Sequence, residues 1–272
     1  MARVQLPTSR LKARRRARRM FAVLGALVVL LALMGGVVGL SYLSALRVQH
    51  ITIVGLSSVN ESLVEASVQD ALDGGYWHLI PKNNIFVYPK GAIERGLLAQ
   101  FPIFSSVVAH AQGLTALTVT VTERQPAALW CGSFATSTAP CLTLDESGTA
   151  YTIAPDFSAS VYRRYTGPLA TTTLPRQFLT PEKFRALSAL ADAIASKAAS
   201  STLDTISIDA SGEVHMQFAS GFTLMFILSG DGADVAQRFA LALTADPFNK
   251  HPLSDFEYLD LRFGDKLYYK LR

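Results

Sequence analysis

An uncharged apolar run near the N-terminus constrains this chain more than any other feature. From Phe21 to Leu43 the sequence reads FAVLGALVVLLALMGGVVGLSYL and contains no Asp, Glu, Lys or Arg. As an α-helix this run is roughly 35 Å long, whereas the hydrocarbon core of a bilayer is about 30 Å thick. The sequence therefore predicts a transmembrane helix over residues 21–43.

A cleavable signal peptide is the alternative interpretation of this run. Signal peptides usually carry an apolar region of about 7–15 residues, followed by a small-x-small cleavage site. The apolar run is longer than that, and Ser44 and Ala45 offer only a poor cleavage site. We therefore expect the run to be retained as a membrane anchor.

The charges around the span predict its orientation. Residues 1–20 contain eight Arg and Lys and no acid, so the positive-inside rule places this tail in the cytoplasm and everything after Leu43 outside. The chain has 25 basic and 21 acidic residues, so subtracting the tail leaves 17 basic against 21 acidic residues outside. Because the basic residues cluster beside a membrane span, they indicate topology and not nucleic-acid binding.

Residues 48–122 show the pattern of a small domain in the order β-α-α-β-β. Val48–Gly55 alternates as a strand does, and Ser58 with Glu61 forms a capping box that predicts the start of a helix. Pro89 suits the first turn of a second helix. Two alternating runs around Gln112-Gly113 then predict a hairpin.

Residues 123–272 predict a second domain, a mixed β-sheet with packed helices. Thr180 and Pro181 have the N-cap and first-turn chemistry of a helix, and a second amphipathic helix is expected over residues 231–246. The alternation of residues 258–271 about Gly264-Asp265 predicts a terminal hairpin. Further strands are expected over residues 127–133, 140–154, 205–210, 213–219 and 221–229. The predicted fold class is α+β.

Four stretches carry a resemblance to a known family. They read VQHITIVGLSSVNESLVEASV (48–68), LLAQFPIFSSVVAHA (97–111), LTVTVTERQPAALW (117–130) and YLDLRFGDKLYYK (258–270). These stretches resemble the FtsQ/DivIB family of bacterial cell-division proteins. The resemblance implies that residues 48–122 form a polypeptide-transport-associated (POTRA) domain and residues 123–272 an FtsQ-type C-terminal β domain. Residues 151–219 match poorly.

The resemblance implies a function in the divisome. Members of this family are non-enzymatic bitopic scaffolds of the inner membrane at the division septum. They bind the small single-span partners FtsB and FtsL, with FtsB adding a strand to the C-terminal sheet edge, and they help to control septal peptidoglycan synthesis. We therefore expect FtsB/FtsL-like proteins and other divisome proteins as partners.

The same resemblance places the docking edge in the terminal hairpin. It implies that Phe263 is an aromatic anchor, that Arg262 pairs with an acidic residue of an FtsB-like partner, and that Tyr268 is a second aromatic contact. The expected edge also contains Gly264, Asp265, Lys266 and Leu267. The alternative is that Phe263 only faces the core and Arg262 is only solvated. Which terminal strand forms the outer edge stays open.

Two other functions compete with a division scaffold. One is a POTRA-type polypeptide-binding protein of an export or outer-membrane assembly system, although such proteins usually carry tandem POTRA units and a barrel. The other is a cell-wall enzyme whose active site has no recognisable motif. A test of peptidoglycan hydrolysis distinguishes the enzyme from the scaffold.

The sequence offers no catalytic or metal-binding constellation. No two of its five histidines, at positions 50, 78, 110, 215 and 251, lie within four residues of each other, so no metal-ligand spacing is present. No Gly-x-Ser-x-Gly motif and no phosphate-binding loop occurs. We expect no enzymatic activity, no cofactor, no metal and no small-molecule substrate.

The two cysteines, Cys131 and Cys141, both belong to the part predicted to lie outside the cytoplasm, where disulfides persist. A short polar run separates them between two expected strands, which favours a bridge worth about 2–3 kcal/mol in the chain-entropy description. The alternative is a pair of reduced, apolar side chains.

Overall fold

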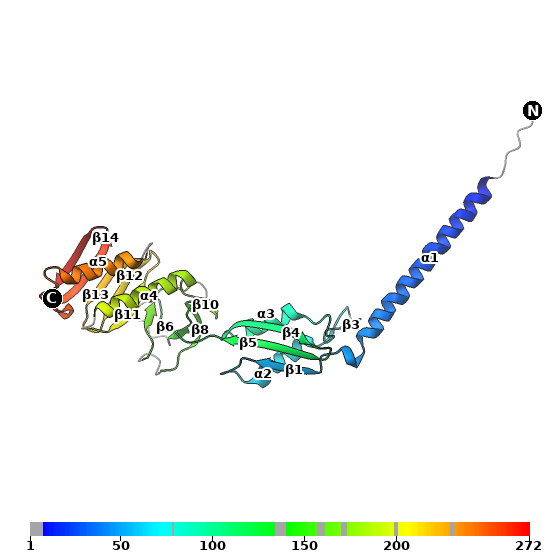
Figure 1. Ribbon diagram of the computed structural model, residues 1–272, viewed down its shortest axis with the longest axis horizontal. Helices are drawn as coiled ribbons and strands as arrows, with labels where there is room; N and C mark the ends of the chain where they lie inside the picture. Colours follow the sequence, from blue (N-terminus) through cyan, green and yellow to red (C-terminus); the bar gives the residue numbers. More distant parts are fainter. Residues whose placement is uncertain are drawn as a thin grey trace, which may run out of the picture. The chain divides into compact units, whose positions relative to one another are not determined.

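A computed structural model of the chain describes residues 8–77, 79–133, 140–156, 161–169, 173–198, 201–228 and 232–272 (Figure 1). The chain has mixed α and β structure, with one N-terminal apolar helix and a large mixed sheet, as the sequence predicts at this level. It divides into two compact units. The first runs to Gln100 and includes Ser106–Thr122, and the second contains Phe101–Ser105 and Glu123–Arg272.

Helix α1, Thr8–Ser41, contains the apolar run (Figure 1). Its segment Arg18–Ser41, 24 residues with a mean hydropathy of 2.7, is long and apolar enough to cross a membrane. The helix ends at Ser41 and not at Leu43, the predicted end of the span. Near this end the Ser41 hydroxyl donates to the Val38 carbonyl at 2.6 Å, and the chain then enters the short 3₁₀ helix η1, Ser44–Leu46.

The first unit also contains a three-stranded sheet in the order β1-β5-β4, with β1 parallel to β5. The expected order of strands and helices is present, with one addition that the sequence did not predict, the small hairpin β2–β3. The elements are β1 His50–Val54, α2 Glu61–Leu72, β2 Gly75–Tyr76, β3 Ile80–Pro81, α3 Lys90–Gln100, β4 Phe104–Gln112 and β5 Ala116–Glu123. Val64 and Val68 of α2 and Ile93 and Leu97 of α3 are buried.

The start of α2 differs from the prediction. Its N-cap is Asn60 and not Ser58, because the Asn60 carboxamide accepts a hydrogen bond from the Ser62 amide at 3.0 Å and from the Ser62 hydroxyl at 2.8 Å. Asn and Ser are about equally good N-caps, so composition alone did not separate the two positions. The helix consequently begins at Glu61.

The second unit is built on a ten-stranded sheet in the order β10-β8-β7-β6-β9-β11-β12-β13-β14-β15. The pairs β6–β9, β9–β11 and β13–β14 are parallel and the other pairs are antiparallel, so the sheet is mixed. Its strands are β6 Ala128–Trp130, β7 Leu142–Leu144, β8 Thr149–Ile153, β9 Arg164–Thr166, β10 Arg176–Gln177, β11 Leu203–Ile208, β12 Glu213–Phe218, β13 Thr223–Ile227, β14 Phe256–Phe263 and β15 Lys266–Leu271.

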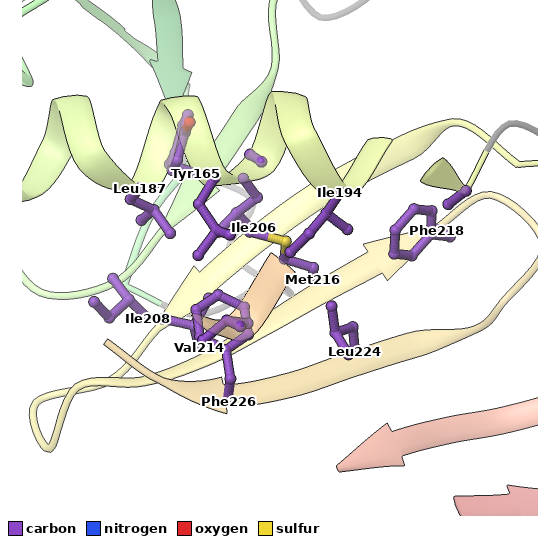
Figure 2. Packing of buried hydrophobic residues seen from close by; sticks show 14 of the residues in the cluster. Tyr165, Leu187, Ile194, Ile206, Ile208, Val214, Met216, Phe218, Leu224 and Phe226 are labelled. Atoms are coloured by element: carbon purple, nitrogen blue, oxygen red, sulfur yellow. The ribbon is translucent and has the colours of Figure 1, made fainter. Parts of the chain in front are cut away.

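Helices α4, Pro181–Lys197, and α5, Gly232–Thr244, supply the apolar side chains that cover one face of this sheet. Figure 2 shows Leu187 and Ile194 of α4 beside Ile206 and Met216 of the strands. The predicted N-terminus of α4 is confirmed, since the Thr180 hydroxyl accepts from the Lys183 amide and Pro181 is the first helical residue. The core of the second unit therefore lies between these helices and the sheet.

Candidate functional site

The terminal hairpin forms one end of the ten-stranded sheet. Strand β14 pairs with β13 on one side and with β15 on the other, and no strand among the described residues pairs with the outer side of β15. The hairpin turns at Gly264, whose φ of 60° is a left-handed value that glycine adopts without a steric penalty. The outer edge is therefore β15, which answers the question that the sequence left open.

Every residue of β15 is exposed, and its side chains alternate between two faces. Tyr269 lies opposite Leu259 in the register, and Tyr268 lies opposite Asp260. Residues opposite each other in an antiparallel pair share a face, so Tyr269 belongs to the core side and Tyr268 to the other side. Lys266 and Lys270 belong to the same edge, and Lys270 pairs with Glu257 at 2.6 Å.

Aromatic contacts support the hairpin on both faces. On the core side, Phe248 stacks on the fully buried Phe256 with ring centroids 4.1 Å apart, and Tyr269 meets Phe248 edge-on at 5.4 Å. On the opposite face, Phe263 and Tyr268 meet edge-on at 5.3 Å. Phe263 keeps 55% of its surface exposed and Tyr268 keeps 49%, so both rings remain available for a further contact.

Arg262 is held inside the protein by two acids. Its Nε and Nη2 donate to the Asp260 carboxylate at 2.9 and 2.7 Å, and its Nη1 donates to Glu213 at 2.7 Å. The Arg262 amide also donates to Asp260 at 3.0 Å. These contacts, which we call the Arg262 clamp (Asp260, Arg262 and Glu213), join β14 to β12.

The electrostatics of the clamp follow from this geometry. Burial alone disfavours the charged form of Asp260, but the hydrogen bonds and positive charge of Arg262 outweigh that effect and lower the pKa of the carboxyl. The same hydrogen bonds, which Arg262 donates to Asp260 and to Glu213, raise the pKa of Arg262. Both groups therefore stay ionised at neutral pH.

The clamp gives Arg262 partners within this chain, because its guanidinium binds the carboxylates of Asp260 and Glu213. Its pairing with an acidic residue of a partner, which the resemblance implies, stays a prediction. Its remaining contact toward the edge is with the Phe263 ring, at 5.7 Å from guanidinium carbon to ring centroid. Arg262 therefore positions the hairpin. Lys266 forms no ion pair with any residue in the described part of the chain and is the better candidate for an acidic partner.

A hollow of about 250 Å³ lies beside β15 on the side of α5. Leu267 of β15 faces it together with Leu241 and Ala242 of α5, and Asp265 of the turn also lines it. Leu241 is 60% exposed and Leu267 is 41% exposed, so this apolar surface continues from the strand onto the helix. An added segment along β15 would cover both residues.

Comparisons with known proteins do not extend this description. No protein-family model and no curated protein matches the chain. A conclusion about function therefore depends on the residues and their arrangement.

Sequence reasoning placed the seven expected residues, Arg262 to Tyr268, in one hairpin, and the structure keeps them together there. It missed Tyr269, Leu271 and Leu241, which contribute to the same surface, and Phe248, which is buried against Phe256 and Tyr269. The alternation of Leu267, Tyr269 and Leu271 was a readable signal for two of them. Leu241 had a signal too, because it adds an apolar residue outside the buried stripe of its helix.

A larger hollow, of about 390 Å³, lies on the sheet around β11 and β12. His215, Thr166 and Ser207 line it, and the Thr166 and Ser207 hydroxyls bond to each other at 2.8 Å. Among the described residues, no group of three or more His, Cys, Asp and Glu could hold a metal ion, and His78 lies outside those residues. The residues that line this hollow show no nucleophile hydrogen-bonded to a base. The edge strand β15 therefore remains the candidate site.

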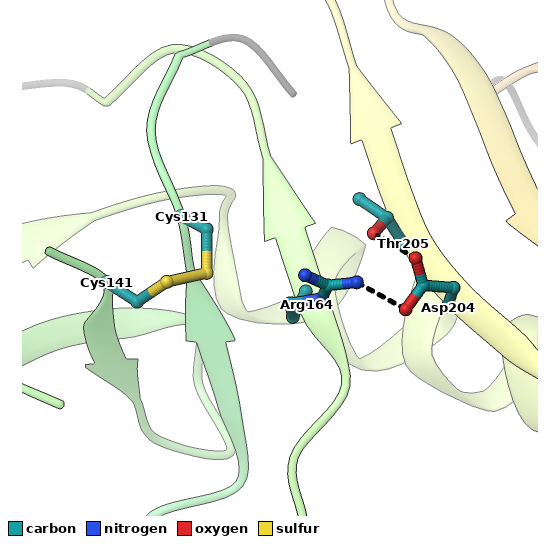
Figure 3. Close-up of a disulfide and its surroundings, with 5 residues drawn as sticks. All are labelled: Cys131, Cys141, Arg164, Asp204 and Thr205. Atoms are coloured by element: carbon teal, nitrogen blue, oxygen red, sulfur yellow. Dashed lines mark hydrogen bonds and ion pairs between the residues drawn. A yellow bond between two sulfur atoms is a disulfide. The ribbon is translucent and has the colours of Figure 1, made fainter. Parts of the chain in front are cut away.

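Cys131 and Cys141 form a disulfide at the ends of β6 and β7 (Figure 3). The Cys131 amide donates to the Tyr165 carbonyl and the Ala154 amide donates to the Cys141 carbonyl, so both half-cystines are also fixed by the sheet. The bridge closes the β6–β7 connection across ten positions of sequence. It stabilises the strands away from β15 and takes no part in the candidate site.

Proposed function

We propose that this chain is a single-pass membrane scaffold that binds an extended segment of another protein along β15. The observation that carries the proposal is the edge itself: six exposed residues in regular strand conformation, bordered by an apolar hollow. An unpaired edge offers a row of N–H and C=O groups to an incoming strand. Main-chain hydrogen bonds then supply affinity, and the alternating side chains supply specificity.

The edge suits a partner of definite chemistry. An added strand with apolar side chains facing α5 would cover Leu267 and Leu241, and aromatic or aliphatic side chains on the other face would meet Phe263 and Tyr268. Lys266 favours an acidic residue of the partner near the turn. The C-terminal, extracytoplasmic segment of an FtsB-like single-span protein is the partner that the family resemblance implies.

The finer assignments belong to the same proposal. A membrane span with a basic tail on its cytoplasmic side supports an extracytoplasmic position for both units. The order of elements in the first unit supports a POTRA-like domain over residues 48–122. With the resemblance of the terminal strands, these features support membership of the FtsQ/DivIB family, a place in the divisome at the septum, and a role in the control of septal peptidoglycan synthesis with FtsB/FtsL-like partners.

The direct test is an affinity measurement with matched surface variants. The full chain in lipid nanodiscs is titrated with a synthetic peptide that covers the extracytoplasmic C-terminal segment of the FtsB-like protein of the same genome. Leu267→Asp puts a charge into the apolar hollow, and Phe263→Ala removes the exposed ring. Each change is expected to cost about 2 kcal/mol of binding free energy or more, which is the usual size of a hot-spot effect.

The control variant is Ile153→Asp, which puts the same charge on a 62% exposed apolar residue of β8, near the other end of the same sheet. It should leave affinity unchanged, and all three variants should keep the thermal unfolding midpoint. Arg262→Glu is unsuitable for this purpose because it would place a third acid in the Arg262 clamp. Equal affinity for wild type and Leu267→Asp would reject the docking edge. Tight binding of an unrelated unfolded polypeptide would instead favour the export-type alternative.

A further inference from the structure

The first unit exposes large apolar side chains on both sides of β3, the strand that contacts α1. Trp77 is 85% exposed, Phe86 is 70% exposed and Leu79 is 55% exposed, and Val87 adds a smaller apolar surface. Trp77 and Leu79 lie in the connection between β2 and β3, and Phe86 and Val87 follow β3. We call these four residues the apolar loops. Exposed apolar residues gathered in this way mark a surface that contacts another protein or a membrane.

Contacts between the loops and the helix fix where this surface lies. The carboxamide of Asn84, a residue only 3% exposed, donates to the Ser41 carbonyl at 3.1 Å and accepts from the Phe86 amide at 3.0 Å. The Ile85 amide also donates to the Leu46 carbonyl at 2.9 Å. One buried side chain thus ties the last residue of α1 to the loop that carries Phe86.

The same surface continues onto the membrane span. A hollow of about 200 Å³ is lined by Val37 and Leu40 of α1 and, across from them, by Ile80, Phe86 and Val87. Val37 and Leu40 belong to the last turn or so of a 24-residue segment that would be about 36 Å long, slightly more than a hydrocarbon core of about 30 Å. Side chains that share a hollow with these two residues therefore lie at the depth of the outer bilayer interface.

The chemistry around the apolar loops fits that depth. Trp and Tyr concentrate at the interface because their rings combine an apolar body with a polar group. Tyr42, directly after α1, is 47% exposed, and the Arg47 guanidinium carbon lies 5.6 Å from the centroid of its ring. Trp77 also has a φ of 49°, a backbone conformation that bulky residues rarely adopt, so its exposed position has a conformational cost.

We infer that the apolar loops insert into the outer interface of the bilayer, with Trp77, Leu79 and Phe86 among the acyl chains nearest the headgroups. The partner of this surface is therefore lipid, not protein. The contact would hold the first unit at the membrane by more than its covalent link to α1. This inference rests on the membrane anchor of the proposed function but requires no protein partner.

The intrinsic fluorescence of Trp77 tests the inference. The full chain is reconstituted into phosphatidylglycerol–phosphatidylcholine vesicles whose phosphatidylcholine is brominated near the glycerol end of the acyl chains. Trp77→Phe is measured in parallel, so that subtraction isolates Trp77 from Trp130. Trp77 should lose most of its emission in brominated vesicles relative to unbrominated ones, and its emission should be shifted to the blue of a water-exposed tryptophan.

The matched control moves the reporter to the other end of the first unit. Leu63 lies in the first turn of α2, beyond β1, and is 58% exposed. In the double variant Trp77→Phe and Leu63→Trp, bromination should leave the emission of the new tryptophan unchanged. Far-ultraviolet circular dichroism should match wild type in both variants, since each replaces an exposed side chain.

The possible results separate this inference from the proposed function. If the protein floats with the vesicles and Trp77 is not quenched, lipid insertion is overturned while the membrane anchor stands. Quenching of the reporter at position 63 as strongly as that of Trp77 also overturns the assignment to the apolar loops. If the protein does not float with the vesicles after an alkaline wash, the membrane anchor fails and the inference fails with it. Quenching of Trp77 alone supports it.

Discussion

The two edges of the ten-stranded sheet are built in opposite ways. At one end, β10 has only two residues, both half-buried, and the Gln177 side chain donates to the Ser147 and Leu179 carbonyls and accepts from the Thr149 hydroxyl. At the other end, β15 has six residues, all exposed. A very short edge strand offers an incoming strand few groups to pair with, whereas a long regular edge invites strand addition. The difference supports the proposal that β15 is the edge that binds a partner.

The two ends also differ in how they are held. Toward β10, the disulfide links β6 to β7, and Arg124 pairs with Asp145 beside the turn between β7 and β8. Toward β15, the Arg262 clamp and the stacked rings of Phe248 and Phe256 support the hairpin from within the unit. With support from within the unit, the outer side of β15 stays exposed and unpaired with any described strand. A preorganised edge loses less conformational entropy when it binds.

Removing the aromatic support of the open edge should have the largest effect on stability. Phe256→Ala empties a fully buried site at the first residue of β14 and should lower the free energy of unfolding by about 3–5 kcal/mol. Denaturant unfolding of the full chain, followed by near-ultraviolet circular dichroism, measures the change. Leu241→Ala, at an exposed position of α5, should stay within about 0.5 kcal/mol of wild type. Equal costs for the two variants would contradict the account.

Removing the disulfide, which lies toward the β10 edge of the sheet, should have the next largest effect on stability. Replacement of both Cys131 and Cys141 by alanine should cost about 2–3 kcal/mol, as expected for a loop of this length. The affinity of β15 for its partner should stay as in wild type, because the bridge is not part of the edge. Unfolding midpoints with and without a thiol reductant measure the effect on wild type. Identical midpoints would show that the bridge contributes nothing.

The Arg262 clamp should make the open end sensitive to acid. The pKa of Asp260 is lowered in the folded protein, so its contribution to stability is fully present above the usual value of 3.8 and is lost as the pH falls through the folded pKa. Asp260→Asn should cost about 2 kcal/mol at neutral pH, the scale of hydrogen bonds to a charged group.

The acid-dependent loss of stability should be smaller in Asp260→Asn than in wild type, although not absent, since the pKa of Asp145 is lowered as well. Unfolding curves measured at neutral and acid pH make the comparison. Asp265→Asn, in the exposed turn of the same hairpin, is the control and should behave as wild type does. An unchanged acid dependence in Asp260→Asn would show that the clamp does not stabilise the hairpin.

The smallest effect on stability is expected at the β10 edge. Gln177→Ala removes the side-chain hydrogen bonds from β10 to Ser147, Leu179 and Thr149 and should cost about 1 kcal/mol. Gln217→Ala, at an exposed position of β12, provides the comparison and should be close to neutral. Thermal unfolding of both variants measures the difference. If the two variants are equally stable, the hydrogen bonds of Gln177 do not secure this edge.

Local chemistry in the sequence predicted some elements well. The start of α4 followed from Thr180 and Pro181, and the terminal hairpin followed from strict alternation around Gly264-Asp265. The short strands β9 and β10 escaped prediction because two or three residues cannot show a period. The N-cap of α2 was placed at the wrong residue because two good capping residues lie close together.

The candidate site was predictable only in part. Its position in the last hairpin was indicated by the resemblance and by the alternation of the strands, but the identity of the outer strand required the sheet order. The role of Arg262 was also out of reach, because its second acid, Glu213, comes from a strand remote in sequence. Whether Arg262 or Lys266 is free of ion pairs depends on such tertiary contacts, and no local pattern encodes them.

Amide hydrogen exchange of the full chain in nanodiscs, with and without the FtsB-like peptide, tests the central claim most directly. The account predicts that amides of β15 exchange readily in the free protein, because no strand in the described part of the chain pairs with its outer side. They should become protected when the peptide is bound. Amides of β10 should exchange equally in both states. Protection confined to strands other than β15, or no change anywhere in the terminal hairpin while the peptide is bound, would contradict the claim that β15 is the docking edge.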